Sequence, residues 1–159
     1  MATDQYRSLS PEAILATLRS LPRRYRAELA NDPSIDLEAV ARDHDGPSPA
    51  QLIATAAARI SVLADAVHQA AVLDEPSVTI APSTTAEAGS VDAAMAALDA
   101  SVAHAVGIVD SLPTEAWARK ARVAGRETNV LELAQDCARE GVERLRELTA
   151  LLDQVKRNR

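Results

Sequence analysis

The sequence predicts an all-α protein, built as a four-helix bundle, and three observations lead to that prediction. Apolar residues recur every third or fourth position over four long stretches, which is the period of an amphipathic helix. Phe is absent, Trp occurs once and Tyr twice, so the core must consist of Ala, Leu, Val and Ile. Ser or Asn precedes each stretch, as a helix N-cap does. Four helices with one apolar face each are buried most simply in a bundle.

The first helix is expected over residues 10–31. Ser10 is the N-cap, and Pro11 has the backbone angle that suits the first helical position. The apolar positions that follow lie at helical spacing: Ile14, Leu15, Leu18 and Leu21. Pro22 either kinks this helix or starts a second piece. A connector over 34–47 follows, with a turn of helix at 36–40.

The second helix is expected over 49–73, after the cap at Ser48, with one buried stripe. A long loop over 74–89 comes next, because it holds Pro76, Pro82 and Gly89. Residues 78–80 form an extended piece for which no partner strand is evident.

The third helix is expected over 90–112, followed by a short turn carrying Trp117 and by a loop or brief hairpin at 122–126. The fourth is expected over 129–157. It opens with a capping box of Asn129 and Glu132. Its nearly heptad stripe is Val130, Ala134, Cys137, Gly141, Leu145, Leu148, Leu152 and Val155. No repeat or boundary divides the chain, so residues 1–159 are predicted to form a single domain.

Charge and composition exclude several classes of partner. The net charge is −6, which argues against nucleic-acid binding because that needs a basic face. No stretch suggests a signal peptide or an apolar run of about 20 residues, so no membrane span is expected and the chain is predicted to be cytoplasmic. Cys137 is the single cysteine, so no disulfide forms within the chain.

Four stretches together resemble the DinB-like superfamily of four-helix bundles, which includes the mycothiol-dependent maleylpyruvate isomerases. They are similar to that family's first helix, its entry to helix two, the step after helix three and the entry to helix four. In this chain they are Leu18–Arg24, Gly46–Ala54, Leu112–Trp117 and Gly125–Leu133. The resemblance covers nearly the whole chain, although each piece is short.

The resemblance implies a divalent metal held by three histidines, one on helix two and two that lie four residues apart on helix four. By register these positions fall on Thr55, Glu140 and Arg144, and none of them is His. Arg cannot ligate a metal, because its guanidinium stays protonated and offers no lone pair. A shift of one residue supplies no triad either. We therefore expect that the metal site is lost and that no cofactor is bound.

Two interpretations of Glu140 and Arg144 stay open. In the first they form an ordinary i, i+4 ion pair on the helix surface, worth about 0.3–0.5 kcal/mol. In the second they line the vacated site with Thr55, as a candidate pocket for a small polar ligand or as a buried clasp between helices two and four. If the pair is buried, removing one member alone is costly.

The remaining candidates for chemistry are three histidines and the cysteine. His44 lies between two aspartates in a polar loop, His68 near the end of helix two, and His104 beside the apolar stripe of helix three. None has the His–His spacing of a ligand set. Cys137 lies on the buried stripe, where a cysteine acts as a small hydrophobe.

Three functions remain as hypotheses. The first is a DinB-like small-molecule binding protein without the metal. The second is a thiol-dependent transferase or isomerase, by analogy with the mycothiol-dependent relatives; it ranks lower because no metal activates the thiol. The third is a homodimeric structural or interaction protein that pairs through the long final helix. Overall the sequence leans away from an enzyme and assigns no catalytic residue.

Overall fold

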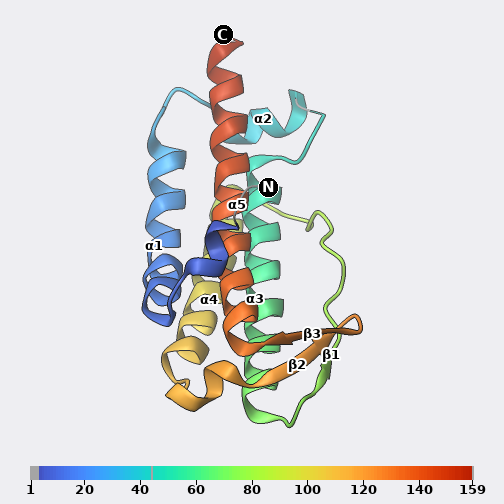
Figure 1. The fold of residues 1–159 in the computed structure, drawn as a ribbon. Coiled ribbons are helices and arrows are strands. Elements are labelled where there is room, and N and C mark those ends of the chain that lie inside the picture. The colour runs from blue at the N-terminus through green and yellow to red at the C-terminus, as the bar shows by residue number, and fades with distance from the viewer. Residues whose placement is uncertain (1–3, 44, 159) are drawn as a thin grey trace.

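The computed structural model describes residues 4–43 and 45–158 and is mostly helical (Figure 1). Its long helices are α1 (Pro11–Ala30), α3 (Pro49–Val72), α4 (Val91–Asp110) and α5 (Val130–Arg157). Its short helical pieces are η1 (Gln5–Ser8), α2 (Leu37–Asp43) and η2 (Thr114–Ala118). The predicted helical class is confirmed, and each long helix begins and ends within two residues of its predicted bounds.

Side-chain caps explain why the long helices begin where they do. The hydroxyl oxygens of Ser10, Ser48 and Ser90 each accept a hydrogen bond from the backbone amide three residues on. At Asn129 the same bond forms, with 2.8 Å between Asn129 Oδ1 and the Glu132 nitrogen. The predicted capping box is only half formed there, since the Glu132 carboxylate accepts from the Thr128 hydroxyl instead. Helix α1 continues through Pro22 without a break.

The long helices pack side by side, with α1 and α5 running in one direction and α3 and α4 in the other (Figure 1). Helix α3 contacts α4 and α5, and α1 contacts the same two helices from the other side. Two hydrogen bonds between side chains join α3 to its parallel neighbour α4: the Ser61 hydroxyl donates to Ser101, and the His104 Nε2 donates to the Asp65 carboxylate. Because consecutive helices α3 and α4 are parallel, the chain must return along their whole length, and residues 73–90 make that return.

A small three-stranded sheet lies beside α3, near the end of the molecule where α3 and α4 finish (Figure 1). Strands β2 (Lys120–Val123) and β3 (Arg126–Asn129) form an antiparallel hairpin. Its two-residue turn has positive φ at Ala124 and Gly125, as a type I′ turn requires. Strand β1 (Ser77–Val78) pairs with β2 in parallel. The hairpin prediction for 122–126 is thus confirmed, while the expectation that the segment near Val78 has no partner is wrong.

The core between the helices consists mainly of Ala, Leu, Val and Ile, as the composition predicts. Tyr25 is the one large aromatic side chain among its fully buried members in the described part of the chain. By length and composition, α3 and α4 would each be apolar enough to cross a membrane, so the expectation that no run reaches that length is wrong by this measure. Apolar core helices of soluble proteins pass the same test, and 61% of the α3 window is buried inside the protein.

Candidate functional site

The three residues at the expected metal positions lie on two helices that contact each other. Thr55 is on α3, while Glu140 and Arg144 are on α5. The Thr55 hydroxyl is buried and has two partners. It donates to the Gln51 carbonyl oxygen at 2.7 Å and accepts from the Ala86 amide at 3.0 Å. Thr55 therefore fastens the returning segment 73–90 to α3 and has little capacity left for a ligand.

Glu140 lies between two guanidinium groups. One belongs to Arg144, whose Nε is 3.8 Å from Glu140 Oε2. The other belongs to Arg59 of α3, whose Nε is 3.7 Å from Glu140 Oε1. All three side chains are mostly buried, with 19%, 25% and 15% of their surface exposed for Glu140, Arg144 and Arg59. The pair predicted on α5 is thus part of a larger ionic group that joins α5 to α3.

Arg59 is the residue that the sequence interpretation missed. It follows Thr55 by four residues and so lies on the same face of α3, one turn further along. Its Nη1 donates to the Ala81 carbonyl oxygen at 2.7 Å, so the returning segment passes over this group too. Helical spacing from Thr55 was the signal that would have found it.

The net charge of this ionic group is balanced at its outer edge by a further carboxylate. Arg144 also pairs with Glu147, with 3.1 Å between Arg144 Nη1 and Glu147 Oε1. Glu147 has 47% of its side chain exposed, so water weakens this outer pair. The inner part, Arg59, Glu140 and Arg144, carries two positive charges and one negative charge. We call these three residues the polar cluster.

The polar cluster has hydrogen-bonding capacity that the protein does not use. Arg59 Nε, Glu140 Oε2 and Arg144 Nε are buried, and none of the three finds a hydrogen-bond partner among the described residues. Their separations of 3.7 and 3.8 Å are too long for hydrogen bonds. A buried polar atom without a partner costs about 1–3 kcal/mol. Water or a bound molecule that supplies the missing partners would recover much of that cost.

These residues do not fit a divalent metal. Guanidinium groups flank the single carboxylate on both sides, and they repel a cation and offer no lone pair. Across residues 4–43 and 45–158, no three or more side chains of His, Cys, Asp and Glu are grouped as a metal would require. His44 lies outside the described residues. His68 is exposed, and His104 is exposed and bonds to Asp65 at 2.8 Å.

Cys137 is fully buried one turn before Glu140, and its Sγ lies 3.5 Å from the Ile60 carbonyl oxygen. Burial, together with the nearby negative charges of Glu140 and Asp136, raises the pKa of this thiol to about 12. A nucleophilic cysteine needs the opposite environment, one that stabilises the thiolate. The surroundings of Cys137 therefore fit the packing role that the sequence predicts.

The apolar stripe of α5 is used inside the molecule. Seven of its eight predicted members are buried, Val155 is half-buried, and α5 packs mainly against α3 and α1. The homodimer hypothesis relied on this stripe as a free surface, so pairing of two copies would need another face and stays a prediction.

Comparison with models of protein families, with curated proteins and with solved structures finds no match to this chain. The resemblance to the DinB-like superfamily rests on the residues quoted above and stays a prediction.

Proposed function

We infer that this chain is a four-helix bundle of the DinB-like group that has lost the divalent-metal site and binds a small polar molecule at the polar cluster. Four long helices around one core, with a long segment between the second and third, support the fold part of the proposal. The unpartnered atoms Arg59 Nε, Glu140 Oε2 and Arg144 Nε carry the ligand part.

The chemistry of these atoms defines the class of ligand. Two buried guanidinium Nε–H groups select an oxygen acceptor, and a carboxylate is the strongest small one. Glu140 Oε2 selects a donor on the same molecule, such as a hydroxyl group. A small hydroxy acid carries both. The inner cluster has one net positive charge that the half-exposed Glu147 carboxylate balances from the outside, so an anion of this kind would meet that positive charge in a more buried position.

The competing interpretation is a structural clasp. Arg59 bonds to Ala81 and faces Glu140, so the cluster holds the returning segment, α3 and α5 together without any ligand. Both roles predict a loss of stability when one charge is removed, because the remaining charges stay buried. Only ligand binding distinguishes them.

The test is a thermal-shift screen with small hydroxy acids, other carboxylic acids and thiols, followed by calorimetry on any compound that raises the melting temperature. We expect a hydroxy acid to bind, and we expect Arg59→Gln and Arg144→Gln to weaken that binding at least tenfold, which is the worth of one charge-assisted hydrogen bond of about 1.5–3 kcal/mol. The matched control is Arg126→Gln on β3, which removes an exposed guanidinium far from the cluster in sequence.

Two results would contradict the proposal. One is that no compound in the screen shifts the melting temperature. The other is that the bound compound keeps its affinity in both cluster variants. If Arg59→Gln and Arg144→Gln lower the melting temperature of the free protein while nothing binds, the polar cluster is a clasp and the ligand part is wrong.

A further inference from the structure

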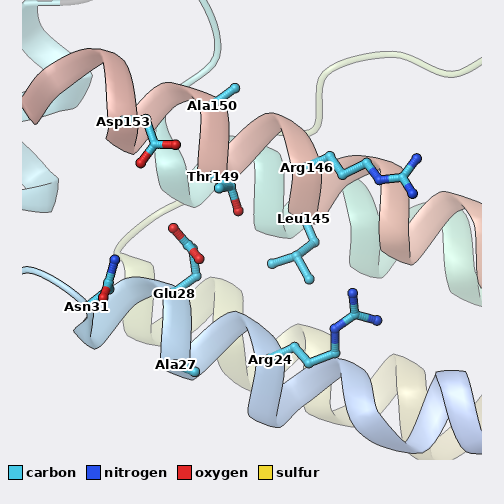
Figure 2. Close-up of a pocket in the computed structure, with 9 residues that line it drawn as sticks. All are labelled: Arg24, Ala27, Glu28, Asn31, Leu145, Arg146, Thr149, Ala150 and Asp153. Carbon is cyan, nitrogen blue, oxygen red and sulfur yellow. The ribbon is translucent and has the colours of Figure 1, made fainter. Parts of the chain in front are cut away.

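A polar depression lies between α1 and the C-terminal half of α5, on a different face of α5 from the polar cluster (Figure 2). Its volume is about 660 Å³, which is within the range of small-molecule sites. Helix α1 contributes Arg24, Ala27, Glu28 and Asn31. Helix α5 contributes Leu145, Arg146, Thr149, Ala150 and Asp153. We call it the α1–α5 groove.

The lining residues follow from helical spacing. On each helix they recur every three or four residues, so each set forms one face, and the two faces look toward each other. Leu145 is buried and forms an apolar floor. Ala27 and Ala150 are too short to fill the space above it. The groove therefore has polar rims, a small apolar floor and open room between the helices.

Charge is separated along the groove. Arg24 and Arg146 lie toward one end, while Glu28 and Asp153 lie toward the other (Figure 2). In the close-up the Arg24 guanidinium points across toward α5, and the Glu28 carboxylate points toward Thr149. Arg146 donates to Glu143 at 3.2 Å, and the Gln5 amide, oriented so that its oxygen accepts, takes hydrogen bonds from both terminal nitrogens of Arg146 at 3.1 and 2.9 Å. The side chains of Arg24, Glu28 and Asp153 make no hydrogen bond or ion pair with any residue that the structure describes, although the Glu28 carbonyl oxygen accepts from the Asn31 amide.

The helix geometry sets the distance between the two ends. With a rise of about 1.5 Å per residue, Arg24 and Glu28 are offset by about 6 Å along α1, and Arg146 and Asp153 by about 10 Å along α5. The acidic end also coincides with the C-terminus of α1 at Ala30, where unpaired carbonyl groups favour a cation. A matching ligand has an anionic and a cationic group separated by roughly these distances.

We propose that the α1–α5 groove binds a zwitterion the length of a dipeptide, with its carboxylate at Arg24, on the side where Arg146 adds positive charge, and its ammonium group at Glu28 and Asp153. Thr149 and Asn31 face the middle and the acidic end, where the amide of a dipeptide offers both a donor and an acceptor. Leu145 accommodates an apolar side chain. The groove is on the α1 side of α5, so this proposal does not rest on the polar cluster between α3 and α5.

The test is calorimetric titration of the full chain with alanyl-leucine in three forms: with free termini, with the N-terminus acetylated, and with the C-terminus amidated. We expect the free dipeptide to bind, and we expect each blocked form to bind about twofold to fivefold more weakly, the range for one exposed ion pair. No heat of binding for the free dipeptide at millimolar concentration, or equal affinity for all three forms, would overturn the proposal.

Two variants assign the ends. Arg24→Gln is expected to weaken binding of the free dipeptide by about twofold to fivefold. It should leave the affinity for the amidated form unchanged, because that form has no carboxylate that could pair with Arg24. Glu28→Gln is likewise expected to weaken binding of the free dipeptide and to leave the affinity for the acetylated form unchanged, because that form has no ammonium group. Both positions are at least partly exposed, so neither substitution threatens folding.

The control is Arg23→Gln, an exposed neighbour on α1 that does not line the groove. Arg144→Gln distinguishes this proposal from ligand binding at the polar cluster. It should weaken binding of a hydroxy acid at the cluster and leave the affinity for the dipeptide unchanged. If Arg23→Gln or Arg144→Gln weakens the dipeptide as much as Arg24→Gln does, the dipeptide is not held in the groove.

Discussion

Helices α1 and α5 meet in two different ways along their length. Near Gly141 they are in close contact: Leu21 reaches the space where a side chain would be, and the Tyr25 hydroxyl donates to the Gly141 carbonyl oxygen at 2.6 Å. From Leu145 to Asp153 the same two helices leave the α1–α5 groove between them. We call the first region the closed contact.

One residue without a side chain explains much of this difference. A Cβ atom added at Gly141 would lie 2.3 Å from Leu21 Cδ1, so Leu21 of α1 can hold its present position only beside a glycine; the contact with Ile60 Cδ1 of α3, at 3.4 Å, would be an ordinary one. Packed helices cross at an angle and therefore diverge away from their closest point. The comparison teaches that the same pair of helices is tightly packed at the closed contact and leaves a candidate binding surface at the α1–α5 groove.

The largest expected effect on stability comes from truncating one buried leucine in each of the two regions. Leu21→Ala removes a fully buried side chain at the closed contact, where close packing around Gly141 hinders collapse, and we expect a loss of about 4 kcal/mol in the free energy of unfolding. Leu145→Ala enlarges a space that already opens to solvent, and we expect about 2 kcal/mol. Denaturant unfolding of both variants measures the difference. Equal losses would mean that the two regions are equally tight.

A pair of glycine substitutions tests whether the closed contact depends on Gly141. Gly141→Ala is expected to lower the free energy of unfolding by about 1–2 kcal/mol, because overpacking outweighs the gain in helix propensity. Gly107→Ala, at an exposed position of α4, has open space around its Cβ and should raise stability by about 0.5–1 kcal/mol. Thermal unfolding of both variants shows whether each substitution raises or lowers stability. A stabilised Gly141→Ala variant would show that Leu21 can move aside freely.

The sequence predicted the helices and buried faces that form the closed contact, but it did not predict the α1–α5 groove. Helical periodicity, the caps at Ser10, Ser48 and Ser90, and the stripe through Cys137 and Gly141 are local patterns, so they predict elements and buried faces. The groove depends on how two helices diverge, which no local pattern encodes. The pairing of Ser77 with Arg122 was missed for the same reason, since the partners are far apart in the chain.

The candidate site shows the same limit at the level of single residues. Family register predicted Glu140 and Arg144, and helical spacing placed them on one face of α5, as the structure also has them. Arg59 was missed because helical spacing from Thr55 marks its face of α3 but does not name its partner on α5. Thr55 was predicted as a pocket residue, yet its hydroxyl bonds to segment 73–90, whose path over α3 cannot be inferred from composition.

The smallest expected effect concerns pH and tests how dry the closed contact is. Cys137 lies one turn before Gly141, and burial first, then the charges of Glu140 and Asp136, raise its thiol pKa to about 12. The unfolded chain has a cysteine pKa of about 8.5, so the native state holds the proton more tightly. Stability from this group is complete below pH 8 and falls as the pH rises toward 12. Between pH 8 and 9.5 we expect a loss of about 1 kcal/mol in the free energy of unfolding.

The matched variant is Cys137→Ala, which removes the titrating thiol from the same buried position. Urea unfolding at pH 8 and pH 9.5 should show that the stability of the variant changes less with pH than that of the natural chain, whatever its absolute value. The comparison uses the slope with pH, so a small cavity left by the missing sulfur does not affect it. Parallel slopes for the two proteins would mean that water reaches Cys137, and the closed contact would then be as open to solvent as the groove beside it.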